Sequence, residues 1–340
     1  MAAPFELSGE NAARYLKDRG IGAGGAPLQC RELGGGVSNT VVLAEGGEER
    51  FILKQALPQL RVKDEWLADR TRIWRERDSL VAVSRVLPVG WVPKILWSDE
   101  ANFLFAMEAA PEPAEFWKSR LLAGQLDANH AKRAGIALGL TIRETWKSGE
   151  YANRFGGQTA FDQLRIDPYY RTVARRNPDI AAEAAEWIAE MDSTRVALTH
   201  GDWSPKNMMV TPRGLFFIDY ECAHFGDPAF DSAFCINHLV LKSFHRPRQA
   251  AGYLRLARLF FTWTAALLPP DACGYFERAT ARHLAFLMLA RVDGKSPVEY
   301  ITDEAARNRI RSTAKTLIAR RAAKLEDCLA IAADAVAELD

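Results

Sequence analysis

The sequence predicts an α+β fold with two lobes, a small N-terminal lobe that combines a sheet with a helix and a larger, mostly helical C-terminal lobe. Short β-like runs surround one long helical stretch before residue 108, whereas apolar residues beyond residue 114 recur mainly at helical spacing. The chain has 340 residues, 48% of them hydrophobic, which is enough to bury a core in each lobe. We therefore divide it into residues 1–108 and residues 109–340.

The elements of the N-terminal lobe follow from its hydrophobic pattern. Four short apolar runs predict strands at Thr40–Ala44, Phe51–Lys54, Lys94–Trp97 and Phe103–Met107. The stretch between the second and third runs has helical spacing and predicts a helix from about Lys63 to Val86. These elements together predict a small α+β lobe.

The C-terminal lobe is predicted to be helical around one hairpin. A helix is expected over Ala114–Trp146, followed by an insertion at 147–195 that ends in the Ala-rich helical run IAAEAAEWIAEM. Two β-like runs, Asn207–Val210 and Leu215–Ile218, flank turn residues and predict the hairpin. Helices are then expected at Phe230–Leu241, Gln249–Leu268, Tyr275–Leu289 and from Asp303 to the end.

Charge and composition exclude several classes of protein. The 44 Lys and Arg residues against 43 Asp and Glu leave a net charge of +1, so no basic field indicates a nucleic acid or an anionic membrane. No window approaches the length of a membrane span, and the first residues lack the pattern of a signal peptide. The five cysteines show no CxxC spacing. We expect a cytoplasmic protein with reduced thiols and with neither nucleic-acid nor membrane partners.

The strongest functional signal surrounds the predicted hairpin. His200-Gly201-Asp202 precedes the hairpin, Asn207 begins its first strand, and Asp219 follows its second. Phosphoryl transfer needs a carboxylate aimed at the acceptor hydroxyl and oxygen ligands that hold Mg²⁺ against phosphates. Two acids and an amide at these positions can converge on one place, which favours phosphoryl transfer over a pair of capped turns.

The order and spacing of these residues resemble those of the protein-kinase-like superfamily. Within this superfamily the chain resembles the aminoglycoside phosphotransferase and choline kinase family, especially the 5-methylthioribose kinases. HGDWSPKN resembles the family's HGDxxxxN catalytic loop, and IDYE resembles its version of the kinase DFG motif. The resemblance implies a protein-kinase-like bilobal fold with an antiparallel sheet in the N-lobe. It also implies ATP and Mg²⁺ as cofactors, Asp202 as the catalytic base, and Asn207 and Asp219 as catalytic residues that bind the magnesium.

Three further residues near this motif receive roles from the same resemblance. His200 would pack and hydrogen-bond the loop rather than act as a base, and Asp231 would brace the loop by accepting backbone hydrogen bonds. Both are then structural parts of the site. Glu221 matches an acid often found in this family and would reach a metal or the substrate, with a surface carboxylate as the alternative.

The N-terminal lobe supplies a nucleotide site by the same resemblance. Lys54 stands at the end of a β-like run, where the family places the lysine that grips the α- and β-phosphates of ATP. A buried lysine needs an anionic partner to stay charged. Glu76 fits the family's ExxxL spacing and is our choice, with Glu65 and Asp69 as alternatives because the phase of the helix is open.

Two other segments resemble nucleotide contacts. A glycine-rich turn before the first strand would let backbone N–H groups approach phosphate, although a flexible turn is the simpler reading of three glycines. FLFAMEAA resembles the strand and hinge that line the edge of the adenine pocket in the family. The alternative is an ordinary core strand, which would have the same kind of sequence. The cofactor-binding candidates in these two segments are Gly35, Gly36, Ser38, Asn39, Met107 and Glu108.

The acceptor is narrowed by a closer resemblance. KQALPQLRVKDEWLADRTRIWRERDSL is similar to the lysine-to-helix segment of 5-methylthioribose kinases, and weaker similarity in SRLLAGQ and LRIDPYY extends it over most of the chain. This favours a sugar-like acceptor. The chain departs from those kinases in GDWSPKN and IDYECAHFG, and it has Ala290 and Arg291 where they hold their substrate with two adjacent arginines. Half of that pair is missing, which argues against methylthioribose itself.

Four further residues are candidates for contact with the substrate. Trp203 would offer an apolar face to a sugar ring or alkyl substituent, with simple packing as the alternative. Lys206 would meet the charge of the γ-phosphate. Arg291, together with Lys295, would face an anionic or hydroxylated substrate, with a solvated loop as the alternative.

These observations predict an ATP-dependent small-molecule kinase that transfers the γ-phosphate to a hydroxyl of a sugar-like acceptor. An aminoglycoside or choline/amino-alcohol phosphotransferase is the alternative, which acidic residues around the acceptor would favour because those acceptors are cationic. A catalytically silent nucleotide-binding regulatory protein is a further alternative. A homodimer is left open, because methylthioribose kinases are often dimers.

Overall fold

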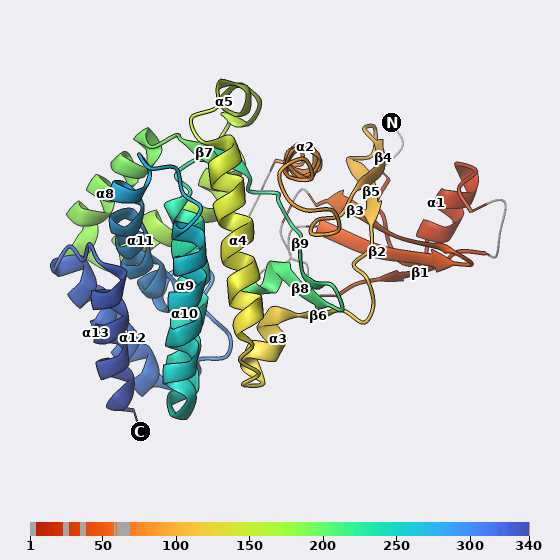
Figure 1. The fold of residues 1–340 in the computed structure, drawn as a ribbon. Coiled ribbons are helices and arrows are strands. Elements are labelled where there is room, and N and C mark those ends of the chain that lie inside the picture. Colours follow the sequence, from red (N-terminus) through yellow and green to blue (C-terminus); the bar gives the residue numbers. More distant parts are fainter. Residues whose placement is uncertain (1–4, 23–26, 35–38, 58, 60–68, 340) are drawn as a thin grey trace. The chain divides into compact units, whose positions relative to one another are not determined.

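The structure is a computed structural model that describes residues 5–22, 27–34, 39–57, 59 and 69–339. It consists of two compact units, Met1–Glu112 and Pro113–Asp340. A sheet dominates the first unit and helices dominate the second (Figure 1). The predicted α+β class is therefore confirmed.

The first unit is built on a five-stranded antiparallel sheet in the order β1-β2-β3-β5-β4 (Figure 1). Its strands are β1 (Gln29–Glu32), β2 (Asn39–Gly46), β3 (Glu49–Ala56), β4 (Ile95–Asp99) and β5 (Leu104–Glu108). The four predicted runs coincide with β2 to β5 and are confirmed. Helix α2 (Arg72–Val83) lies within the predicted helical stretch. Strand β1 was not predicted, because its mostly exposed residues form no apolar run.

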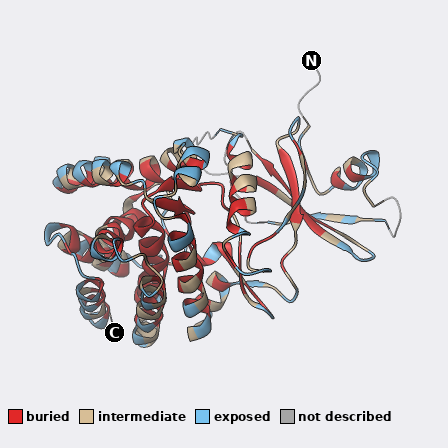
Figure 2. Cartoon of the chain, turned by 45° about the horizontal axis from the view of Figure 1, so that its top comes forward, coloured by how far each residue is buried: buried red, intermediate tan, exposed pale blue. Residues whose placement is uncertain are grey.

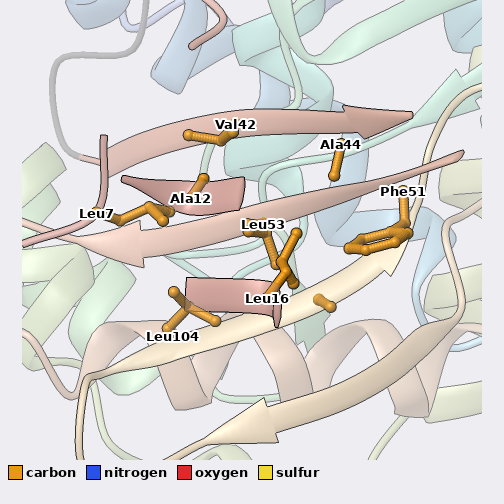
Figure 3. Packing of buried hydrophobic residues seen from close by; sticks show 9 residues of the cluster. Leu7, Ala12, Leu16, Val42, Ala44, Phe51, Leu53 and Leu104 are labelled. Atoms are coloured by element: carbon orange, nitrogen blue, oxygen red, sulfur yellow. The ribbon is translucent and has the colours of Figure 1, made fainter. Parts of the chain in front are cut away.

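Helix α1 (Ala12–Asp18) packs on the sheet and was also not predicted. Its buried side chains Ala12 and Leu16 join Leu53 of β3 in one hydrophobic cluster (Figure 3). A helix of 7 residues is too short for its period to be recognised in the sequence. The cluster anchors β3, which carries Lys54.

The second unit begins with β6 (Glu115–Phe116), α3 (Trp117–Leu122) and α4 (Ala128–Thr145). The single helix predicted over 114–146 is therefore wrong in its first third. Gly124 has a φ of +78°, a left-handed conformation that ends α3. Asp127 then caps α4, because its carboxylate accepts a hydrogen bond from the backbone N–H of Asn129 at 2.8 Å.

The predicted insertion folds as a series of short helices. They are α5 (Gly149–Phe155), α6 (Thr159–Phe161), the π-helix η1 (Asp162–Arg171), α7 (Thr172–Arg176), the 3₁₀ turn η2 (Pro178–Ile180) and α8 (Ala181–Ser193). The Ala-rich run corresponds to α8. Pro168 lies inside η1 and lacks the N–H that a regular helical ladder requires. η1 buries Arg165 and Tyr169, so it carries a cation into the interior of the unit.

Two small antiparallel sheets frame the motif residues. β6 (Glu115–Phe116) pairs with β8 (Met208–Thr211), which pairs with β9 (Gly214–Phe217), and β7 (Ala197–Thr199) pairs with β10 (His224–Gly226). The predicted hairpin is therefore confirmed as β8 and β9. The loop 200–207, which we call the catalytic loop after the family motif that it resembles, leaves β7 and ends in the 3₁₀ turn η3 (Pro205–Asn207). The segment with Asp219 joins β9 to β10, so the β7–β10 pair brings both segments together.

The remainder of the second unit is helical. Its elements are α9 (Ala229–His245), the 3₁₀ turn η4 (Pro247–Gln249), α10 (Ala250–Ala265), α11 (Cys273–Asp293), α12 (Glu304–Ala319) and α13 (Leu325–Ala337). The helix predicted from Asp303 to the end is therefore two helices, and Arg321 between them has a φ of +47°. α9 is buried at every residue from Ala229 to Phe244 and packs against α10 and α11. The helices that surround it are exposed mainly on their outer sides (Figure 2). In the part of the chain that the structure describes, no helix is both long and apolar enough to cross a membrane.

Helices α4 and α10 approach closely at Gly135. A Cβ at this position would lie 2.4 Å from the backbone oxygen of Phe260. Gly135→Ala should therefore force the helices apart and lower the free energy of unfolding by about 1–3 kcal/mol. Gly149→Ala in α5 meets nothing within 4 Å and should leave the Tm unchanged or raise it. Scanning calorimetry of both variants checks this, and equal Tm values for the two would contradict it.

Candidate active site

The catalytic loop begins with a turn that only glycine fits. Gly201 has a φ of +77°, and a Cβ there would lie 2.7 Å from the backbone oxygen of Cys222. The left-handed conformation is unfavourable for other residues, and the approach to Cys222 leaves no room for a side chain. The glycine of the HGD sequence thus lets the loop pass close to the segment after Asp219.

Asp231, in the first turn of α9, braces this turn. Its Oδ2 accepts the backbone N–H of His200 at 2.6 Å, and its Oδ1 accepts that of Gly201 at 2.8 Å. Complete burial raises the pKa of Asp231 to about 7, while the two N–H donors act in the opposite direction. The contacts are of the bracing kind expected for this residue.

His200 ties the catalytic loop to the end of β9. Its Nε2 donates to the backbone oxygen of Ile218 at 3.1 Å, and its Nδ1 accepts the backbone N–H of Asp202 at 3.2 Å. Burial lowers the pKa of His200 to about 4, so the ring is neutral, as an accepting Nδ1 requires. Both ring nitrogens are used within the protein, which leaves neither to serve as a base toward a substrate.

The carboxylate of Asp202 is buried and paired with two cations. Its Oδ2 lies 2.6 Å from Nη2 of Arg165 and 2.8 Å from Nζ of Lys206. Burial alone would raise the pKa of Asp202, but the charges of Arg165 and then Lys206 outweigh it and hold the pKa well below its usual range. Oδ1 is buried and has no hydrogen-bond partner among the described residues, so this ionised oxygen keeps an unused capacity to accept a hydrogen bond.

Arg165 was not identified from the sequence. It reaches the catalytic loop from η1, and its Nε also donates to the backbone oxygen of Gly201 at 2.7 Å. Its guanidinium lies over the rings of Tyr169 and Phe234, at 5.8 and 5.7 Å from their centres. The sequence signal for Arg165 was its position between two apolar residues in LRI. Such a position indicates a buried cation with an acidic partner, but it does not identify that partner.

Asn207 and Asp219 present oxygen atoms suited to a magnesium ion. The side-chain amide of Asn207 donates from Nδ2 to the backbone oxygen of Asp202 at 3.0 Å, which leaves its Oδ1 as a ligand. The backbone N–H of Ile218 donates to the backbone oxygen of Asn207 at 3.0 Å and holds the two segments together. Asp219 has a φ of +70°, a strained conformation of the kind found at functional sites.

This donor set fits Mg²⁺ bound together with a nucleotide. An amide oxygen and a carboxylate are hard ligands, and Mg²⁺ is commonly held by one or two carboxylates plus substrate phosphates. The described residues contain no cluster of three or more His, Cys, Asp or Glu side chains that would hold a metal alone. Asn207 and Asp219 would therefore hold the metal only with phosphate oxygens completing its shell.

In the first unit, Lys54 pairs with Glu76. Lys54 Nζ lies 2.8 Å from Oε1 and 2.7 Å from Oε2 of Glu76, and both side chains are buried. Asp69 caps the turn before α2, where its Oδ1 accepts the backbone N–H of Thr71 at 2.8 Å, and Glu65 lies outside the described residues. A buried pair of this kind keeps the lysine charged.

The other nucleotide candidates are only partly described. Gly35, Gly36 and Ser38 lie outside the described residues, and Asn39 is the buried first residue of β2. Met107 and Glu108 are the last residues of β5, and Glu108 Oε2 accepts the backbone N–H of Lys94 at 3.2 Å. Their contact with adenine stays a prediction.

The structure favours packing over substrate contact at Trp203. The indole is 2% exposed and stacks on Phe217, with ring centres 4.8 Å apart and an angle of 12°. The free apolar face suggested by the sequence is therefore covered by β9. Glu221 is buried too, at 7% exposure, so it is not the surface carboxylate of the alternative interpretation.

The two basic residues near the end of α11 have different surroundings. Arg291 is buried, and its Nη1 donates to the hydroxyl oxygens of Tyr169 and Ser296 at 2.9 Å each. Lys295 donates to Asp167 Oδ2 at 2.8 Å on the partly exposed surface. The side chain of Arg291 thus lies in the interior of the second unit, which also holds Asp202. The charge of Lys295 is already compensated by Asp167.

The fold and the catalytic loop define a protein of the phosphotransferase class. The sequence matches the profile of the phosphotransferase enzyme family (APH) over residues 29–268, more than half of the chain, and the chain belongs to this family. The family resemblance predicted from the motifs is confirmed.

Curated relatives are methylthioribose kinases. The protein of that name from Escherichia coli O45:K1 (strain S88 / ExPEC) is 29% identical over 266 residues, which are 69% of this chain and 63% of the relative. Methylthioribose kinase 2 of Oryza sativa subsp. japonica is 26% identical over 251 residues, 66% of this chain and 58% of the relative. The chain spans about six-tenths of the length of these relatives.

A solved structure supports the fold. Amicoumacin kinase hAmiN, in complex with AMP-PNP, Ca²⁺ and Ami, is similar with a TM-score of 0.55 at 11% identity, over 87% of this chain and 90% of that one. Likeness at this identity concerns the fold alone, and it confirms the predicted kinase-like architecture.

The brace at Asp231 can be tested through stability. Asp231→Asn keeps the size of the side chain but replaces one accepting oxygen with an N–H donor, so one buried backbone N–H of the catalytic loop loses its acceptor. The free energy of unfolding should fall by about 1–3 kcal/mol in urea titrations. Asp334→Asn, an exposed change in α13, should stay within about 0.5 kcal/mol of wild type. Equal losses of unfolding free energy in both variants would contradict the bracing role of Asp231.

Proposed function

We propose that the chain is an ATP-dependent small-molecule kinase that transfers the γ-phosphate of ATP to a hydroxyl of a sugar-like acceptor. The observation that carries the proposal is the ionised Asp202, fixed by the brace at Asp231 and by Arg165, on the loop that also carries Asn207. Membership of the phosphotransferase family and the methylthioribose kinase relatives support the same reaction class.

The residues of the chain would divide the work of phosphoryl transfer. Asp202 would orient the acceptor hydroxyl at Oδ1 and take its proton as the new P–O bond forms, the bond to the bridging oxygen breaks and ADP leaves. Lys54 would bind the nucleotide phosphates, and Asn207 and Asp219 would hold Mg²⁺. When bound, Mg²⁺ neutralises the charge of the transferred group.

The low pKa of Asp202 agrees with this role. A carboxylate paired with Arg165 and Lys206 is a weak base but is ionised throughout the physiological range. Phosphoryl transfer has a loose transition state in most analyses, so correct orientation contributes more than proton abstraction. A firmly held, ionised Asp202 meets that requirement.

The support for a sugar-like acceptor comes from the methylthioribose kinase relatives. The charges around Asp202 do not choose between a sugar-like and a cationic acceptor, because Arg165 and Lys206 are balanced there by Asp219 and Glu221. The sugar-like class of the acceptor and a cytoplasmic location stay predictions, and a homodimer stays open.

Replacement of the base tests the reaction. Asp202→Asn should reduce ADP release with Mg·ATP and a sugar panel by about 10²–10⁴-fold, because it removes the proton acceptor, while the affinity for ATP stays close to wild type. Asp334→Asn serves as the control. Wild-type turnover in a folded Asp202→Asn variant would refute the assignment, and nucleotide binding without turnover of any acceptor by the wild type would favour the regulatory alternative.

Arg165 is a positioning residue whose role shows in a pH profile. Its charge holds the pKa of Asp202 down against burial, so in Arg165→Met the pKa of Asp202 should rise and the acid limb of kcat should move to higher pH. Arg171→Met, which removes a surface cation of the same segment, should leave the profile in place. A profile of Arg165→Met that loses amplitude but does not shift would mean that Arg165 acts through packing alone.

A further inference from the structure

Lys242 is a buried cation without an acidic partner. Its side chain on α9 is fully enclosed, with 0% exposure. Nζ donates to the backbone oxygen of His238, one turn earlier on the same helix, at 3.2 Å and lies 5.0 Å from the centre of the Tyr300 ring. In the part of the chain that the structure describes, no carboxylate forms an ion pair with it. An ammonium group has three N–H donors, so most of its binding capacity is unused.

The nearby acidic groups are already compensated by other cations. Glu299, on the loop after α11, forms an ion pair with Lys118. Asp202 is paired with Arg165. Burial, followed by the charges of Lys118 and Arg291, lowers the pKa of Lys242 to about 7. Glu299 acts in the opposite direction, but it is paired with Lys118, so no described carboxylate forms an ion pair with Lys242. A buried ammonium without such a partner is costly unless an anion accompanies it.

Arg291 adds a second incompletely bonded cation to the same region. Its Nη1 is bonded to Tyr169 and Ser296, but its Nε is buried without a hydrogen-bond partner among the described residues. Lys242 donates to the backbone oxygen of His238, whose ring lies 5.4 Å from that of Phe234. The ring of Phe234 in turn lies 5.8 Å from that of Tyr169, which accepts a hydrogen bond from Arg291. These contacts join the two cations within the second unit.

Aromatic side chains connect these cations with Asp202. Tyr169 accepts a hydrogen bond from Arg291, and its ring lies 5.8 Å from the guanidinium of Arg165, the partner of Asp202. The ring of Phe234 lies 5.7 Å from the same guanidinium and 5.4 Å from the ring of His238. The path from Asp202 to Lys242 thus runs through residues in contact within the second unit.

We propose that the acceptor carries an anionic group, a carboxylate or a phosphate, which Lys242 and Arg291 bind while the acceptor hydroxyl lies at Asp202. This inference rests on the proposed kinase function and specifies its substrate class: a hydroxylated acid of sugar size, such as a sugar acid or a sugar phosphate. The anion supplies the counter-charge that Lys242 lacks and accepts a bond from Nε of Arg291. A neutral thiosugar or a cationic amino alcohol would leave Lys242 uncompensated.

Matched acceptors separate this proposal from the function on which it rests. ADP release is measured with Mg·ATP and the sets D-glucose, D-gluconate and D-glucose 6-phosphate, and D-ribose, D-ribonate and D-ribose 5-phosphate. At least one anionic member should exceed its neutral counterpart in kcat/KM by about tenfold or more, the equivalent of one charge-assisted contact. The carboxylate and phosphate arms distinguish the two kinds of anion. Turnover of neutral sugars that equals or exceeds that of the anions would leave the kinase function intact and overturn the anion site.

The Lys242→Met variant identifies the residue responsible. Removal of a buried unpaired charge should leave the protein folded, with a Tm at or above that of wild type. The preference for the anionic acceptor should disappear through a higher KM for that acceptor, while the KM for ATP stays unchanged. Lys17→Met, an exposed change in α1, should behave as wild type in both respects. An unchanged preference in a folded Lys242→Met variant would refute the role of Lys242.

A binding measurement decides the case in which no acceptor is turned over. Thermal shifts with D-gluconate and D-ribose 5-phosphate are compared with those of D-glucose and D-ribose. Stabilisation of the wild type by an anionic compound, absent from Lys242→Met, would retain the anion site although the kinase function had failed. Equal shifts for the anionic and neutral compounds would overturn the site as well.

Discussion

The carboxylate of Asp231 fixes the geometry on which the candidate site depends. It accepts the backbone N–H groups of His200 and Gly201 together, so the start of the catalytic loop is attached to the first turn of α9. α9 is buried along nearly its whole length, and close-packed interiors do not yield to small displacements. Asp202 follows directly in the chain, so the position of the proposed base is set by the core. Preorganisation of this kind is the main contribution that a protein makes to phosphoryl transfer.

Electrostatics in the second unit favour negative charge at and around Asp202. Arg165 and Lys206 keep Asp202 ionised, and Lys242 and Arg291 have unused donors in the same region. Lys242 and Arg291 are buried cations with donors that no described carboxylate accepts, and an anion from outside the chain would use them. The proposed base and the inferred substrate class would therefore both depend on buried cations, which η1, α9 and α11 carry.

The sequence predicted best the part of the candidate site whose residues lie close together in the chain. The catalytic loop and Asp219 flank one hairpin, so their meeting follows from a short turn and strand pairing. Arg165 and Lys242 were not identified, because their positions depend on how η1 and α9 pack around the catalytic loop. The free face predicted for Trp203 is covered by Phe217 of β9, and this contact depends on the path of the catalytic loop, which residue spacing does not reveal. The break in the helix predicted over 114–146 depends on the conformation of Gly124, which a periodic pattern does not reveal.

The π-helix η1 has a consequence for how related proteins compare. It delivers Arg165 to Asp202 from a segment far upstream of the catalytic loop, and its wide turns accommodate Pro168 within a buried stretch. The pKa of Asp202, the proposed base, is thus lowered by a part of the chain that shares no motif with it. Two members of the family with identical catalytic loops would differ in base strength if their η1 segments differed, so motif identity alone does not rank such enzymes by reactivity.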